Sequence, residues 1–253
     1  MALLVLVAVL LCSVVGSAIG ARLLGVARRT RQLPELLVGT AIFMYSGLAL
    51  PALLAMGLPW ISLGTARALQ LTQQAANCAA LTALILFTWR AFRPDAGWAR
   101  LASSAGIAVA LVASWGTVSV APDAPGASAM PPQVRPYVSL MILVWTGTFL
   151  WTGLESVRFH SKMRRRLAIG LGDPMVCNRF LLWAIWGIAC FALGILDLGY
   201  NVAGLDLSRH PAPLLTICAS TSLSSAVWYL AFFAPEGYER LVSARRRAAS
   251  LSP

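Results

Sequence analysis

Residues Phe233–Leu241 read Phe-Ala-Pro-Glu-Gly-Tyr-Glu-Arg-Leu, and residues Phe92–Leu101 read Phe-Arg-Pro-Asp-Ala-Gly-Trp-Ala-Arg-Leu. With one gap at Ala96, both follow the pattern Phe-x-Pro-acid-Gly-aromatic-x-Arg-Leu. Each stretch comes directly after a long apolar run. A pattern that recurs after the same kind of segment indicates an internal duplication, which constrains the architecture of the whole chain.

The composition of the chain is that of a membrane protein. Of its 253 residues, 58% are hydrophobic and 11% are charged, whereas a soluble domain carries about 25% charged residues. The abundance of Arg, Ala, Leu and Gly, with a single Lys, is typical of a GC-rich bacterium. We therefore expect a multi-pass protein of the cytoplasmic (inner) membrane of a bacterium.

Seven apolar runs are long enough to cross a bilayer as helices, which takes about 20 residues each. They span residues 2–26, 35–58, 67–91, 101–121, 136–157, 176–199 and 211–234. The strands of a membrane barrel are about half as long and alternate in polarity. No positive charge precedes the first run, so a retained helix is favoured over a signal peptide. The sequence predicts an all-α seven-transmembrane-helix bundle, a single domain over residues 1–253 without a soluble domain.

The basic residues set the expected orientation, because cytoplasmic loops are enriched in Arg and Lys. With the N-terminus outside and the C-terminus inside, only Arg67, Arg135 and Arg209 of the 20 basic residues fall on the outer side. The others, including Arg245, Arg246 and Arg247 of the tail, would face anionic lipid headgroups. This placement accounts for the net charge of +11 and argues against nucleic acid as a partner.

The two related stretches close the third and the seventh predicted helices. We expect a 3+1+3 arrangement of parallel repeats, with repeat 1 at about 1–101, a linking helix at about 102–121 and repeat 2 at about 136–241. An irregular outer loop over 121–136 would join the halves. In each stretch, Pro is expected to end a helix and the acid with Gly to turn the chain. Asp173 is expected to be the N-cap of the sixth helix, ahead of Pro174.

The residues needed for catalysis or cofactor chemistry are missing or scattered. His160 and His210 are predicted to lie in loops on opposite faces, and no Cys forms a C-x-x-C pair. No His is expected to lie near a Cys. The five cysteines are therefore interpreted as small buried apolar residues. We expect no catalytic residue, no metal site, no cofactor and no enzymatic activity.

Polar side chains recur in the outer halves of three predicted helices. The residues interpreted as candidate ligand-binding residues are Gln70, Gln73, Gln74, Asn77, Asp197, Tyr200, Asn201, Thr216 and Ser220. The four amides share one helical face, which should point into the bundle because amides facing lipid are costly. Alternatives remain open: a packing network for the amides, an interfacial acid at Asp197, and helix-packing contacts for the hydroxyls.

The densest charge follows the fifth predicted helix, in the third cytoplasmic loop. Its members are Arg158, Lys162, Arg164, Arg165 and Arg166. They could contact lipid headgroups, the simpler interpretation, or dock an acidic cytoplasmic protein partner. Glu155, near the end of that helix, is expected to pair with Arg158, its i,i+3 neighbour.

Three blocks of sequence carry a resemblance. Arg164–Pro174, Asn178–Trp183 and Leu33–Leu37 resemble blocks in an uncharacterised family of bacterial seven-transmembrane-helix proteins, which implies the fold and no activity. The topology also resembles that of rhodopsins. However, Lys162 is the only Lys, so the last helix has no Lys for a retinal Schiff base. The topology also resembles that of sugar transporters built as 3+1+3, but the membrane Pro motifs of those transporters are not found in this sequence.

These observations favour a sensor- or receptor-like protein that detects a small polar ligand or a membrane state and signals through basic cytoplasmic loops. The alternative is a small-solute transporter with its substrate between the repeats. A receptor should show one outward cavity above a packed inner half. A transporter should show polar residues on facing helices at mid-membrane, with Gly or Pro at mid-helix, for which Pro51 is a candidate.

Overall fold

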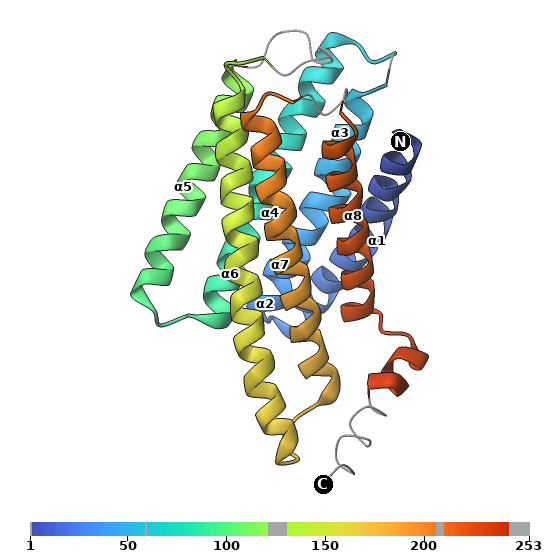
Figure 1. Ribbon diagram of the computed structural model, residues 1–253, viewed down its shortest axis with the longest axis vertical. Coiled ribbons are helices and arrows are strands. Elements are labelled where there is room, and N and C mark those ends of the chain that lie inside the picture. Colours follow the sequence, from blue (N-terminus) through green and yellow to red (C-terminus); the bar gives the residue numbers. More distant parts are fainter. Residues whose placement is uncertain (1, 59, 121–130, 206–209, 243–253) are drawn as a thin grey trace.

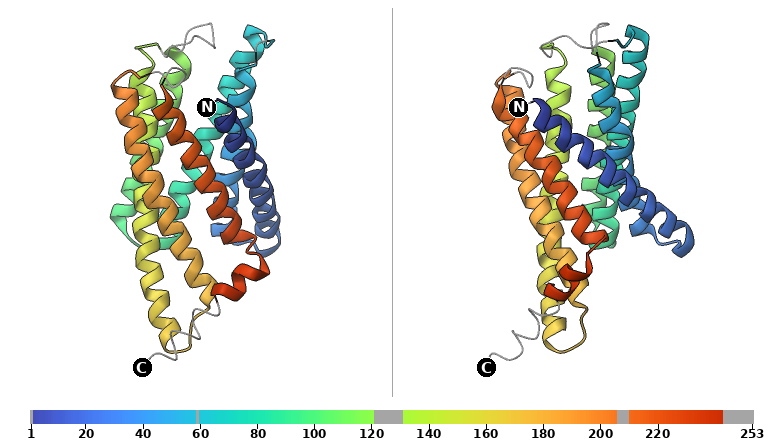
Figure 2. Two further views of the ribbon diagram at one scale, coloured as in Figure 1. Left: turned by 45° about the vertical axis from the view of Figure 1, so that its right-hand side comes forward. Right: turned by 90° about the vertical axis from the view of Figure 1, so that its right-hand side faces the viewer.

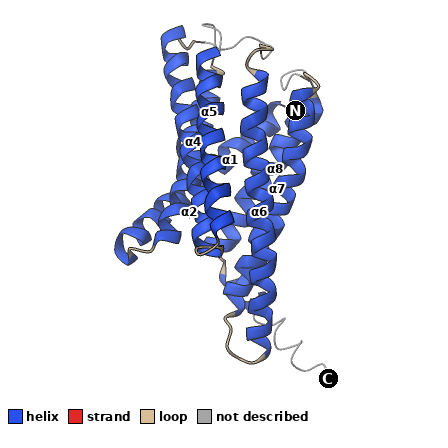
Figure 3. Ribbon diagram, turned by 90° about the vertical axis from the view of Figure 1, so that its left-hand side faces the viewer, coloured by secondary structure: helices blue, strands red, loops and turns tan. Residues whose placement is uncertain are grey.

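The computed structural model describes residues 2–58, 60–120, 131–205 and 210–242 (Figure 1). Over these residues the secondary structure is helical, without a strand (Figure 3). Most of the predicted loop over 121–136, as well as Arg209 and the tail residues Arg245, Arg246 and Arg247, lies outside the described residues.

The seven predicted apolar helices are confirmed. The elements are α1 (Ala2–Thr30), α2 (Leu33–Phe43), η1 (Met44–Ala49), α3 (Leu50–Met56), α4 (Leu63–Phe92), α5 (Gly97–Val120), α6 (Arg135–Ala168), α7 (Pro174–Val202) and α8 (Pro211–Phe232). Because α2, η1 and α3 are continuous, they form one span, and seven spans are long and apolar enough to cross a membrane.

The spans form a ring in sequence order. Each span packs against its neighbours in the chain, and α1 packs against α8 to close the ring. The helix α5 lies at the periphery, against α4 and α6, which also contact each other (Figures 1 and 2). We call the end of the bundle where α1 begins the N-face, and the opposite end, where α6 and α7 join, the C-face (Figure 1).

The helix α6 is longer than the sequence suggests and extends past the other helices at the C-face (Figure 1). The predicted third loop, from Arg158 to Arg166, is in fact its last turns, and His160 is helical rather than in a loop. The reason is that Arg, Lys, Met and Leu are good helix formers. The chain leaves the helix only at Gly170, whose φ of 78° suits glycine.

The following turn forms as predicted. Asp173 is the N-cap of α7, and its Oδ1 accepts a hydrogen bond of 2.8 Å from the backbone N–H of Met175. Pro174 occupies the first turn, where a backbone N–H is not needed. This cap fixes the direction in which α7 re-enters the bundle.

The second span contains a π-helical segment, η1, that the sequence analysis did not predict. Its register joins the N–H of Leu50 to the carbonyl of Tyr45, five residues earlier. In the same register the carbonyl of Ser46 would bond to residue 51, which is Pro and has no N–H. Instead, the Ser13 hydroxyl of α1 donates to the Ser46 carbonyl at 2.6 Å. The distortion is therefore stabilised by a neighbouring helix.

The two related stretches differ in structure. After α4, residues 93–96 form a turn that leads into α5 at Gly97. After α8, residues 236–242 are helical, so Gly237 does not turn the chain as expected. Glu236 Oε2 lies 3.2 Å from Nη2 of Arg240, one helical turn later. The shared pattern thus ends a helix in both places but continues the chain differently.

Candidate functional site

A cavity of about 1030 Å³ occupies the centre of the ring. It reaches Arg135 and His210 at the N-face ends of α6 and α8, and Trp183 and Trp228 toward the C-face. Every span contributes to its wall, and α5 contributes only through Thr117. A volume at the upper end of the range for small-molecule sites gives room for a ligand of drug size or smaller.

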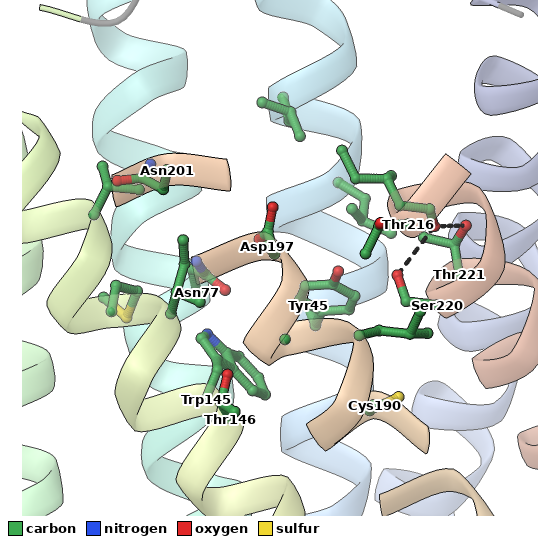
Figure 4. A pocket seen from close by; sticks show the side chains of 18 of the residues that line it. Tyr45, Asn77, Trp145, Thr146, Cys190, Asp197, Asn201, Thr216, Ser220 and Thr221 are labelled. Atoms are coloured by element: carbon green, nitrogen blue, oxygen red, sulfur yellow. Dashed lines mark hydrogen bonds between the residues drawn. The ribbon is translucent and has the colours of Figure 1, made fainter. Parts of the chain in front are cut away.

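All nine candidate residues from the sequence line this one cavity. They are Gln70, Gln73, Gln74 and Asn77 on α4, Asp197, Tyr200 and Asn201 on α7, and Thr216 and Ser220 on α8. Figure 4 shows Asn77, Asp197 and Ser220 arranged around the same space. The structure therefore brings together groups that are up to 150 positions apart in the chain.

The amide face of α4 has unsatisfied acceptors. Gln70 Oε1 and Asn77 Oδ1 are buried and have no hydrogen-bond partner. A third amide oxygen at the cavity does have a partner: Asn201 Oδ1 accepts a hydrogen bond of 2.9 Å from Ser139 Oγ. Buried polar atoms in proteins normally have partners, so the free acceptors at Gln70 and Asn77 argue against a closed packing network for these amides.

The hydroxyls of α8 donate their protons to their own helix. Thr216 Oγ1 donates to the Ala212 carbonyl at 3.1 Å, and both Ser220 Oγ and Thr221 Oγ1 donate to the Ile217 carbonyl, at 3.0 and 2.8 Å (Figure 4). Bonds of this kind satisfy the hydroxyl proton locally. The oxygen lone pairs that remain can accept a hydrogen bond from a ligand in the cavity.

Asp197 is the only acid on the cavity wall within the described part of the chain. Its side chain is half-buried, and no described residue forms an ion pair or hydrogen bond with it. Tyr45 of η1 and Trp145 of α6 lie around the same part of the cavity (Figure 4), with ring centroids 5.8 Å apart. A carboxylate beside two aromatic rings is thus left open to the cavity.

Aromatic side chains form the floor of the cavity toward the C-face. Trp186 packs edge-on against Phe149 at 5.2 Å and against Trp228 at 5.9 Å. Its indole N–H donates to Ser224 Oγ at 2.9 Å, which joins α7 to α8. Trp145, Trp183 and Trp186 pack in the core, and the same rings also line the cavity.

Tyr45, near Asp197, could not be recognised as a cavity residue from the sequence. Its run, Phe43-Met44-Tyr45-Ser46, lacks a polar periodicity that would distinguish a cavity face from a lipid face. Pro51, six positions later, is the one signal that could have drawn attention to this segment, because Pro disturbs the helix that precedes it.

The C-face half is closed by an ion-pair cluster. Glu155 of α6 is 1% exposed, and its Oε1 lies 2.9 Å from both Arg93 Nε and Arg158 Nη1. The pair with Arg158 confirms the prediction. The second partner, Arg93, comes from the first related stretch and ties the end of α4 to α6. A smaller cavity of about 350 Å³ adjoins these groups and also contacts Lys162 and Arg165.

Hydroxyl and aromatic contacts pack the C-face half around this cluster. Thr88 Oγ1 and Thr152 Oγ1 are fully buried and lie 2.7 Å apart, joining α4 to α6. Phe92 packs on Phe159 and Phe180, with centroids 5.0 and 6.3 Å away. These contacts separate the central cavity from the basic residues at the C-face.

The predicted separation of histidine from cysteine is wrong at one place. His160 Nδ1 lies 3.4 Å from Cys177 Sγ, because α6 and α7 run side by side. The same nitrogen lies 2.9 Å from the Cys177 carbonyl, which requires an N–H at Nδ1. It therefore cannot take the thiol proton as a base would. Among the residues described, no group of three His, Cys, Asp or Glu side chains could hold a metal.

The basic residues predicted as a lipid or partner contact form a separate group. Arg158, Lys162, Arg164, Arg165 and Arg166 are exposed on the last turns of α6, and Arg158 also belongs to the Glu155 cluster. None of them lines the central cavity.

Comparison with protein-family models and with curated proteins gives no match. The interpretation of the cavity therefore depends on its own geometry.

Proposed function

We propose that this chain is a receptor-like, non-enzymatic membrane protein whose central cavity binds a small polar ligand. The observation that carries the proposal is the convergence of nine polar side chains on one cavity above a packed C-face half. Unsatisfied acceptors at Gln70 and Asn77 support it, since a ligand would satisfy them.

The proposal includes an orientation, with the N-face outside and the C-face in the cytoplasm of a bacterium. Its support is the distribution of basic residues, which gather on the extension of α6 and at the C-face ends of the other helices. In this orientation the ligand enters from outside. The basic extension then lies where anionic headgroups or an acidic cytoplasmic partner can contact it.

The route from cavity to C-face would run through α6 and α7. Trp145 and Trp186 on these helices line the cavity, and Glu155 and His160 farther along α6 contact α4 and α7. Close packing of α6 on α7 at Gly153 and Gly187 would let the two helices move as a unit. A ligand that shifts Trp145 or Trp186 would thereby alter the Arg93–Glu155 contact.

A transporter is the second candidate, and two observations favour it. Pro51 and η1 interrupt the second span beside the cavity, as mid-helix breaks do in transporters. The helix contacts also fit a parallel duplication. The pairs α1–α2, α2–α4 and α1–α8 correspond to α6–α7, α7–α8 and α6–α4, with α5 outside both sets.

Reconstituted protein tests the two candidates against each other. Purified full-length chain would be assayed in proteoliposomes for uptake of labelled small solutes, and in nanodiscs for binding of the same solutes. The receptor proposal predicts saturable binding without uptake above that of empty liposomes. Binding that survives Gln73→Ala, Asn77→Ala and Asp197→Asn alike would contradict the cavity as the site. Saturable uptake would favour the transporter.

A further inference from the structure

The wall of the cavity near Asp197 consists largely of hydrogen-bond acceptors. The hydroxyl protons of Thr216, Ser220 and Thr221 are already donated to backbone carbonyls. Asn77 Oδ1, close to Asp197 in Figure 4, is buried without a donor. The amide nitrogens of the same wall are hydrogen-bond donors, so the neutral groups alone do not favour one ligand charge. The Asp197 carboxylate therefore sets the preference, which is for a cation. A ligand rich in N–H donors is complementary to this surface.

Of the described Asp, Glu, His, Lys and Arg residues, three line the cavity: Arg135, Asp197 and His210. They lie at different depths. Arg135 and His210 are at the N-face ends of their helices. The Arg135 guanidinium packs against Gly204, seven residues beyond Asp197 in the chain. Asp197 is farther inside, where a lone carboxylate loses much of its hydration. An unpaired acid at this depth is costly, and a bound cation would remove that cost.

Aromatic rings beside the carboxylate point to the same ligand charge. Tyr45 and Trp145 lie with ring centroids 5.8 Å apart, and Phe149 lies 5.3 Å from Trp145. The face of an aromatic ring attracts a cation, and Trp does so most strongly. The same rings offer an apolar surface for the rest of a ligand.

We propose that the cavity binds a small organic cation, an ammonium group attached to an apolar or aromatic body. Asp197 is its counter-ion, Asn77 and the α8 hydroxyls accept its N–H groups, and Tyr45 with Trp145 form the aromatic wall. This inference rests on the proposed ligand-binding function and adds the chemical class of the ligand.

Three matched probes test the charge preference. The full-length protein in nanodiscs is titrated with 2-phenylethylammonium, with the neutral 2-phenylethanol and with the anion phenylacetate. We expect saturable binding of the ammonium compound in preference to the other two. The variant Asp197→Asn should weaken its binding about ten- to a hundredfold, the effect of losing one hydrogen-bonded charge partner. Glu236→Gln, which changes an exposed acid at the C-face, should leave binding unchanged.

The possible results separate this inference from the proposed function. Equal or tighter binding of the alcohol or of phenylacetate would overturn the inference while leaving a ligand-binding cavity in place. Phenylacetate binding that is lost in Arg135→Gln would also overturn it, because the anchor would then be Arg135. Ammonium binding that is unchanged in a folded Asp197→Asn variant would contradict the role of Asp197. If none of the three probes binds, the cation inference fails, and the proteoliposome and nanodisc assays with other solutes decide the proposed function.

Discussion

Two acidic side chains lie inside the described part of the bundle, and their surroundings differ: one is ion-paired and the other is not. Glu155, in the C-face half, is 1% exposed and contacts two guanidinium groups at 2.9 Å. Asp197, in the N-face half, faces a cavity of about 1030 Å³ and has no ionic partner among the described residues. The first acid joins helices together. The second leaves a charge available, which is the arrangement expected of a binding site.

The largest expected effect concerns the partners of Glu155. The double variant Arg93→Gln, Arg158→Gln leaves a buried carboxylate without compensation, which should destabilise the protein by roughly 3 kcal/mol or more. Unfolding in mixed micelles measures the change. Adding Glu155→Gln to the double variant should recover most of the loss, because no buried charge then remains. Arg240→Gln breaks only the exposed pair with Glu236 and should have no measurable effect. Equal stability of all four proteins would contradict a structural role for Glu155.

A smaller effect is expected where α6 and α7 touch. A Cβ at Gly187 would lie 2.7 Å from the Gly153 backbone, whereas a Cβ at Gly199 on the same helix would contact nothing within 4 Å. Gly187→Ala should therefore destabilise the protein by about 1–3 kcal/mol, as overpacking does. Gly199→Ala should be neutral or stabilising, because Ala has the higher helix propensity. Thermal unfolding of the two variants side by side measures the difference. A destabilised Gly199→Ala with an unaffected Gly187→Ala would reverse this assignment.

The smallest expected effect on stability is that of Asp197→Asn. Removing an unpaired charge should leave the stability of the unliganded protein unchanged or raise it by about 1 kcal/mol at most. The unfolding midpoint without added ligand is the measurement. A large loss of stability would mean that Asp197 holds the bundle together as Glu155 does, and the contrast between the two acids would disappear.

The periodicity and charge of the sequence were sufficient to predict much of the structure. Hydropathy alone located the seven spans. A segment in lipid must satisfy its backbone hydrogen bonds internally, so each long apolar run is expected to form a helix. The Asp173 cap and the Glu155–Arg158 pair are local and were also predicted. The second partner of Glu155 was not, since Arg93 is 62 positions away.

The cavity residues also divide into those that the sequence could predict and those that it could not. The amide face of α4 could be predicted because four polar side chains recur at helical spacing in an apolar run. Tyr45 could not, because an aromatic residue in an apolar run carries no sign of the face on which it lies. The π-helical register that places Tyr45 depends on Ser13 of another helix. The end of α6 was placed too early because a charged segment was interpreted as a loop.

Accessibility of two positions to a thiol reagent tests whether the N-face half of the bundle is hollow and the C-face half is packed. In a background with Cys190 and Cys218 replaced by Ala, the remaining cysteines, Cys12, Cys78 and Cys177, are buried. Single variants Ser220→Cys, on the cavity wall, and Ser156→Cys, fully buried in the C-face half, would be treated in spheroplasts with a membrane-impermeant thiol reagent. This arrangement predicts rapid labelling of Ser220→Cys and none of Ser156→Cys. Labelling of Ser156→Cys from outside, or of Ser220→Cys only from the cytoplasmic side in inverted vesicles, would contradict it.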